Sequence, residues 1–193
     1  MAKKKQTILV VIGSPRRRGN SAALAERVAK SAAAAGAAVE TVFLQELEIK
    51  PCTACNACRK KKTRGCVIRD AMQPLYPKIR AADAIVIASP VYWFTVSAQT
   101  KLFMDRWYAL GGDNDYRGLR GKRFGILMAF ADADAFSSGA VNALHTFQDA
   151  IGYLEGSIAG MIYGSAGEAG EIRKRRDLMQ QAAELGKKLA SPA

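Results

Sequence analysis

Apolar residues along this chain fall into short runs that alternate with longer segments of mixed character. The first run, at 8–12, contains five consecutive apolar residues, most of them β-branched. Such a run is typical of a strand that is buried on both faces of a parallel sheet. Comparable runs predict strands at 39–44, 84–88 and 124–130, and a fifth strand within 153–163.

Helical spacing marks the segments between these strands. Leu24, Val28 and Ala32 recur every four residues, which predicts a helix over 21–35 with one apolar face. Asn20 and Ser21 are residue types that cap helices, and they stand at its start. Further helices are expected at 70–80, from 97 to about 110, after 139 to about 151, and at 171–189.

Five strands that alternate with five helices predict a doubly wound α/β fold, in which a parallel sheet lies between two layers of helices. In such sheets a ligand binds at the carboxyl ends of the strands. The loops 14–21, 89–96 and 131–139 follow the first, third and fourth predicted strands, so we expect them to converge there. A separate loop at 45–66 carries all four cysteines of the chain.

The loop after the first strand has the composition of a phosphate site. A strand, a tight polar loop and a helix start follow one another, so backbone N–H groups and the positive end of the helix face the loop. Ser14, Asn20 and Ser21 add hydroxyl and amide groups, and the guanidinium of Arg16 can bind a phosphate with two hydrogen bonds. The loop matches neither common glycine-rich phosphate motif. An ordinary turn with solvated arginines is therefore the alternative interpretation.

Three adjacent aromatic residues mark the loop after the third strand. Tyr92, Trp93 and Phe94 follow Pro90 and Val91 at the carboxyl end of a buried strand. These side chains offer a flat apolar wall for a planar ring, although packing on a neighbouring loop or subunit is the alternative. A loop that suits a phosphate and a loop that suits a ring together predict a mononucleotide such as FMN.

Composition narrows the class of protein. A chain of 193 residues suffices for one domain with its own core, and 49% apolar and 24% charged residues are ordinary for a globular protein. No apolar run approaches the roughly 20 residues that cross a bilayer. We therefore expect a single domain over 1–193, no membrane association and a cytoplasmic location.

The formal net charge of +12 changes this picture little. The positive charges are dispersed in short groups, and the sequence contains no helix-turn-helix, zinc-finger or RNA-binding signature. We therefore expect no specific nucleic-acid binding. A basic surface of this kind favours phosphorylated small molecules as ligands.

Three groups of motifs occur together in this chain: Gly13-Ser14-Pro15-Arg16 with Gly19-Asn20-Ser21, then Ser89-Pro90-Val91-Tyr92-Trp93, then Lys101 with Met104-Asp105-Arg106. The combination resembles the NADPH-dependent FMN reductase family of flavodoxin-like folds. The resemblance implies a three-layer fold with strand order 2-1-3-4-5 and with FMN at the carboxyl edge of the sheet. It also implies a homodimer or homotetramer. The cofactor-binding residues that it implies are Ser14, Arg16, Gly19, Asn20 and Ser21 for the phosphate loop, and Pro90, Val91, Tyr92 and Trp93 for the flavin.

The four cysteines Cys52, Cys55, Cys58 and Cys66 lie within 15 residues, in the spacing C-x2-C-x2-C-x7-C. Disulfides are disfavoured in a cytosolic chain, and structural zinc usually takes two separated CxxC pairs. Three cysteines at consecutive x2 spacing are similar to the sequence that binds clusters in ferredoxins. On the residues alone, an iron–sulfur cluster, zinc and free thiols all stay open.

Within the resembled family, the iron–sulfur flavoprotein subgroup carries a compact cysteine motif after the second strand. This resemblance implies a [4Fe–4S] cluster on the four cysteines, in an insertion at about 45–69. We expect an FMN-dependent oxidoreductase or electron-transfer flavoprotein, with NAD(P)H or ferredoxin as electron donor and a small-molecule or protein redox partner. The alternative is a cluster-free NAD(P)H-dependent FMN or quinone reductase. No side chain is assigned a catalytic role, because FMN supplies the chemistry.

Overall fold

A computed structural model describes residues 5–60, 65–111 and 116–192. Its centre is a parallel sheet in the order β2-β1-β3-β5-β6, to which the short β4 adds an antiparallel partner for β3. Counted over the parallel strands alone, this is the predicted order 2-1-3-4-5. The strands are β1 (Thr7–Ile12), β2 (Ala38–Phe43), β3 (Ala84–Tyr92), β4 (Thr95–Val96), β5 (Arg123–Phe130) and β6 (Ser157–Ser165).

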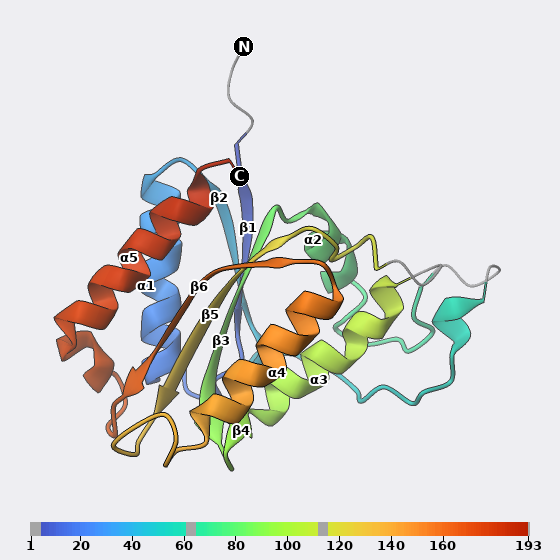
Figure 1. The fold of residues 1–193 in the computed structure, drawn as a ribbon. Helices are drawn as coiled ribbons and strands as arrows, with labels where there is room; N and C mark the ends of the chain where they lie inside the picture. Colours follow the sequence, from blue (N-terminus) through green and yellow to red (C-terminus); the bar gives the residue numbers. More distant parts are fainter. Residues whose placement is uncertain (1–4, 61–64, 112–115, 193) are drawn as a thin grey trace.

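Helices cover both faces of the sheet (Figure 1). One face carries α1 (Asn20–Ala34) and α5 (Arg176–Ala190), which pack against each other. The other face carries α2 (Leu75–Ala81), α3 (Ala98–Asp105) and α4 (Ala140–Tyr153). Four short 3₁₀ turns complete the described elements: η1 (Leu44–Glu46), η2 (Ala57–Arg59), η3 (Arg106–Leu110) and η4 (Glu171–Lys174). The predicted doubly wound, three-layer architecture is therefore confirmed.

Burial on both faces explains the continuous apolar run of β1. Ile8 and Val10 belong to the core beneath α1 and α5, whereas Leu9 and Val11 belong to the core beneath α2, α3 and α4. Successive side chains of a strand point to opposite faces, so a strand between two cores needs an apolar residue at every position.

The prediction of a loop at 89–96 is wrong, because β3 continues to Tyr92 and the chain then turns back into β4. Val91 pairs with Val96 and Tyr92 pairs with Thr95 in an antiparallel hairpin. The two turn residues, Trp93 and Phe94, have positive φ angles of 47° and 64°. β-branched and aromatic residues favour strands, which accounts for the extension of β3.

Several helix boundaries differ from those expected. The helix predicted at 70–80 begins only at Leu75, because the Asp70 carboxylate accepts the Met72 backbone N–H and holds a turn before it. The helix predicted from 97 to 110 is α-helical only as far as Asp105 and continues as η3. The helix predicted at 171–189 is divided into η4 and α5.

Two further boundaries bear on the carboxyl edge. The N-cap of α1 is Gly19, so Asn20 and Ser21 lie inside the first turn and do not cap the helix. β6 extends to Ser165, two residues beyond the range expected for the fifth strand. Within the described ranges, no helix combines the length and the apolar character needed to cross a membrane.

The close approach of α5 to α1 depends on Gly186. A Cβ atom at this position would lie 2.4 Å from the backbone oxygen of Val28 and 3.0 Å from the backbone nitrogen of Ala32. We predict that Gly186→Ala lowers the free energy of unfolding by about 1–3 kcal/mol, because the backbone of α1 cannot move aside cheaply. The loss should occur even though alanine is the better helix former by about 1 kcal/mol. Urea unfolding of the cofactor-free protein measures it.

Gly152→Ala in α4 is the matched control. An added Cβ there meets no atom within 4 Å, so this substitution should raise the free energy of unfolding by up to about 1 kcal/mol. Equal effects of the two substitutions would contradict this account of how α1 and α5 pack.

Candidate cofactor site and cysteine loop

The loops that follow β1, β5 and β6, together with the carboxyl ends of β3 and β5, surround a hollow of about 250 Å³ at the carboxyl edge of the sheet. Eight of the nine predicted cofactor-binding residues line it: Ser14, Arg16, Gly19, Asn20, Ser21, Pro90, Val91 and Tyr92. The structure therefore brings together the two loops that the sequence marks for a phosphate and a ring.

The ninth predicted residue, Trp93, lines an adjoining hollow of about 210 Å³. Val91, Phe130 and Ala131 belong to both hollows, so the two spaces are neighbours. Pockets for cofactor-sized ligands usually measure about 300–1,000 Å³. A ligand of that size would therefore extend from one hollow into the other.

The first loop keeps its shape through Ser14 and Gly19. The Ser14 hydroxyl accepts the Arg16 backbone N–H at 3.0 Å and donates to the Arg16 carbonyl oxygen at 3.1 Å. A Cβ at Gly19 would lie 2.8 Å from the Ser14 hydroxyl and 3.0 Å from that same carbonyl oxygen. Glycine is therefore required at this position, and the tight turn leads directly into the first turn of α1.

Ser21 carries the clearest sign that this hollow suits an anion. The residue is 1% exposed, and its hydroxyl has no hydrogen-bond partner among the described residues. It lies in the first turn of α1, where backbone N–H groups have no acceptor within the helix. A buried hydroxyl without a partner costs about 1–3 kcal/mol, and a phosphate oxygen would satisfy it. Hydroxyl, helix end and Arg16 together fit the phosphate of FMN.

Other polar residues of the first loop have partners elsewhere. The Asn20 amide donates to the carbonyl oxygens of Ala166 and Glu168 at 3.0 and 2.9 Å, and its oxygen accepts the Ile172 N–H at 3.2 Å. Asn20 therefore holds the segment after β6 against the start of α1, and its predicted contact with the phosphate stays a prediction. Arg17 pairs with Glu46, away from the hollow.

Sequence reasoning missed one wall of the hollow. Ala166, Gly167 and Ala169, which follow β6, line it together with Ala129 at the end of β5. Small residues offer no chemical signature of their own. The one usable signal was position, because the segment follows a predicted strand of a parallel sheet.

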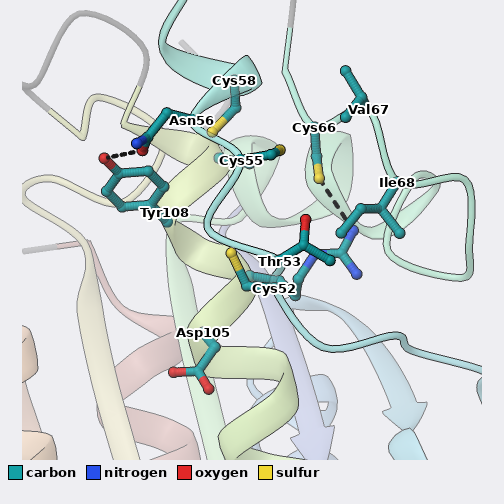
Figure 2. A pocket seen from close by; sticks show the side chains of 12 residues that line it. Cys52, Thr53, Cys55, Asn56, Cys58, Cys66, Val67, Ile68, Asp105 and Tyr108 are labelled. Atoms are coloured by element: carbon teal, nitrogen blue, oxygen red, sulfur yellow. Dashed lines mark hydrogen bonds between the residues drawn. The ribbon is translucent and has the colours of Figure 1, made fainter.

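The cysteine loop surrounds a second, much smaller hollow of about 20 Å³, which lies beside α3 and η3. Figure 2 shows the side chains of Cys52, Cys55, Cys58 and Cys66 gathered around it. Three of the cysteines come from the first part of the loop, and Cys66 comes from its end. Within 5–60, 65–111 and 116–192, however, no three Cys, His, Asp or Glu side chains form a ready-made metal site.

The four thiols differ in their surroundings. Burial raises the pKa of the Cys58 thiol, and the neighbouring Cys66 acts in the same direction. A hydrogen bond from the Ala57 backbone, with a second from the Thr53 side chain, lowers the pKa of the exposed Cys55 thiol.

Sequence reasoning missed a buried ion pair between Arg106 and Asp70. Arg106 lines the same hollow as the four cysteines.

A sequence model of the NADPH-dependent FMN reductase family matches residues 6–190. The chain belongs to this family. Among solved structures, an NAD(P)H:quinone oxidoreductase from Methanothermobacter marburgensis superposes with a TM-score of 0.71 over 96% of this chain and 99% of that chain. At 14% sequence identity, this likeness shows the fold alone. The predicted family and the flavodoxin-like fold are confirmed.

Several curated relatives carry the name iron-sulfur flavoprotein, among them the following two. The protein from Archaeoglobus fulgidus is 36% identical over 121 residues, which cover 63% of this chain and 53% of that protein. The protein from Methanosarcina thermophila is 41% identical over 96 residues, which cover 50% of this chain and 49% of that protein. The chain thus spans about half the length of these relatives.

The unpartnered hydroxyl of Ser21 yields a prediction with two opposite effects. Ser21→Ala should leave the free energy of unfolding of the cofactor-free protein unchanged or raise it, because it removes an unsatisfied buried group. The same substitution should weaken FMN binding by about tenfold, the usual loss for one hydrogen bond to a charged group. Urea unfolding and a flavin-fluorescence titration measure the two effects.

Ser31→Ala, further along the same helix, is the matched control. Ser31 is also buried but does not line the hollow, so FMN affinity should not change. Unchanged FMN affinity of Ser21→Ala would show that the phosphate does not reach the first turn of α1.

Proposed function

We propose that the protein binds FMN across the two joined hollows and acts as an FMN-dependent oxidoreductase. The observation that carries this proposal is the buried Ser21 hydroxyl, which has no partner in the described part of the chain and lies beside Arg16 at the positive end of α1. Next to this phosphate-binding corner stands a wall of Pro90, Val91 and Tyr92, which suits a planar ring.

In this arrangement Ser14, Arg16 and Ser21 would hold the phosphate, and Tyr92 and Trp93 would lie along the ring. FMN supplies the redox chemistry, accepting a hydride or electrons and releasing them. The chain itself binds the phosphate, orients the ring and covers one side of it with apolar side chains. Membership in an NADPH-dependent family supports NAD(P)H as the electron donor.

The cysteine loop binds a [4Fe–4S] cluster in the same proposal. Four thiols around one hollow form the ligand set that such clusters take in proteins. The name of the two curated relatives adds support. Because no complete metal site is present among the described side chains, cluster binding must draw the thiols together, as metal binding commonly orders its own ligands.

That same absence of a ready-made site favours a second candidate, a cluster-free NAD(P)H-dependent FMN or quinone reductase. In this case the four cysteines remain thiols, and the two-electron chemistry of FMN suffices. The two candidates share the flavin site and differ only in what the cysteine loop holds.

Cysteine substitution separates the two candidates. We predict that Cys55→Ser, purified without oxygen, loses most of the iron of the wild-type protein but keeps its FMN. Val67→Ala is the control, because Val67 lines the same hollow, is 46% exposed and has no atom that could bind iron, so this variant should keep both. Iron and flavin assays on the same samples measure the outcome. Wild-type protein with FMN but no iron supports the cluster-free reductase, and protein without FMN after reconstitution contradicts both candidates.

Exposed aromatic side chains beside the flavin hollow suggest how the chain assembles. The aromatic side chains of Trp93 and Phe94, which line the second hollow, are 91% and 55% exposed, and this supports a homodimer or homotetramer in which a second copy covers them. Sedimentation that finds monomers alone contradicts this.

The cysteines of the chain form no disulfide, which fits a cytoplasmic protein with a small-molecule or protein redox partner.

A further inference from the structure

Arg106 is a charged residue in an apolar environment next to the cysteine loop. The Arg106 and Asp70 side chains are each only 1% exposed, and they form an ion pair. Asp70 accepts from both terminal nitrogens of the guanidinium, at 3.2 Å from Nη2 to Oδ1 and at a shorter distance from Nη1 to Oδ2. Although burial acts against its charge, this pairing raises the pKa of Arg106, so the guanidinium stays protonated.

The pair joins the two ends of the cysteine loop. Arg106 Nη1 donates to the carbonyl oxygen of Lys50 at 2.7 Å, just before Cys52. Asp70 accepts the Lys50 backbone N–H at 2.9 Å and the Met72 backbone N–H at 3.0 Å. Two segments 20 residues apart are therefore fixed to one another at the base of the loop.

Arg106 also contacts a candidate ligand directly. Its Nη2 donates to the sulfur of Cys66 at 3.4 Å, the hydrogen bond drawn in Figure 2. The Nε–H of Arg106 is buried and has no partner among the described residues. A guanidinium in this position thus has one donor on the sulfur and a further donor that no group of the described residues accepts.

Hydrogen bonds and positive charge near the sulfurs of a cluster stabilise its reduced, more negative state. The effect is strongest where water is excluded, because charges interact more strongly at low dielectric. The carboxylate of Asp70 acts in the opposite direction from the same buried position.

We propose that Arg106 is a positioning residue that fixes Cys66 as a ligand and raises the reduction potential of the cluster, while Asp70 lowers it. This inference rests on the proposed cluster in the cysteine loop. It assigns to one buried ion pair both the closure of the loop and the potential of the group that the loop holds.

Two conservative substitutions should shift the midpoint potential in opposite directions. Asp70→Asn leaves the charge of Arg106 uncompensated, so it should favour the reduced state by about tenfold, a rise of 59 mV for one electron. A lysine at position 106 cannot bind Asp70 with two nitrogens and donate to Cys66 at the same time. Arg106→Lys should therefore disfavour the reduced cluster several-fold, which lowers the midpoint potential. An anaerobic redox titration followed by electron paramagnetic resonance measures both shifts.

Two controls make the same chemical changes outside the ion pair. Asp105→Asn removes a carboxylate that lines the same hollow, but Asp105 is 46% exposed and pairs with Lys101, so water screens it. Arg69→Lys changes an exposed arginine beside Asp70. Both controls should leave the potential close to that of the wild-type protein.

The outcomes separate this inference from the proposed function. A wild-type protein that takes up no iron after anaerobic reconstitution overturns the proposed cluster and the inference with it. If the wild-type protein binds a cluster, the inference alone is overturned by either of two results. The midpoint potentials of both variants shift in the same direction from the wild-type value, or they shift no further than those of the controls. Either variant tests the inference alone: a fall in the potential of Asp70→Asn, or a rise in that of Arg106→Lys, overturns it.

Discussion

Parallel strands that are buried on both faces all end at the same edge of their sheet, and the molecule is organised around this constraint. In-register pairing of β1 with β3 sets Ile12 beside Ala88, and the Gly13 N–H donates to the Ala88 carbonyl oxygen at 2.8 Å. The loop after β1 and the last residues of β3, with their turn into β4, must therefore lie side by side at this edge. The Ser97 hydroxyl, which donates to the Gly13 carbonyl oxygen at 2.7 Å, fixes the start of α3 at the same edge.

α3 connects the two candidate sites of the chain. Ser97 caps its N-terminal end and bonds to Gly13, one residue before Ser14 of the flavin hollow, whereas Arg106 follows directly after its last residue and contacts the cysteine loop. Eight helical residues rise about 12 Å, so these two anchoring residues are separated by roughly that length. The helix therefore holds the two sites at a fixed separation, because its two ends are anchored by buried polar contacts of Ser97 and Arg106.

The sequence predicted the sheet and most of the flavin hollow because their signals are local. An apolar run such as 8–12 is stable only when it is buried on both faces of a sheet, and the segments after parallel strands converge at one edge because of the topology. The β3–β4 hairpin was missed because its turn consists of Trp93 and Phe94, which lack the Asn-Gly signature of two-residue turns. Their positive φ angles are set by the surrounding fold rather than by local preference.

Long-range polar contacts were not predictable from the same sequence. The partners of Asn20 are backbone oxygens 146 and 148 residues away, which no local pattern reveals. Arg106 and Asp70 are 36 residues apart, and a charged residue shows its burial only once the helices have packed. The clustering of four cysteines indicated the chemistry of the loop, but it did not indicate that a buried cation contacts one of them.

The most direct test of the central claim is a crystal structure of anaerobically purified protein, with anomalous diffraction recorded at the iron edge. We expect flavin density that extends from Arg16 and Ser21 past Tyr92, and an anomalous peak among the four cysteines beside Arg106. Flavin density at any other place on the molecule would contradict the assignment of the carboxyl-edge hollow. Flavin density in that hollow without an iron peak would contradict the assignment of the cysteine loop.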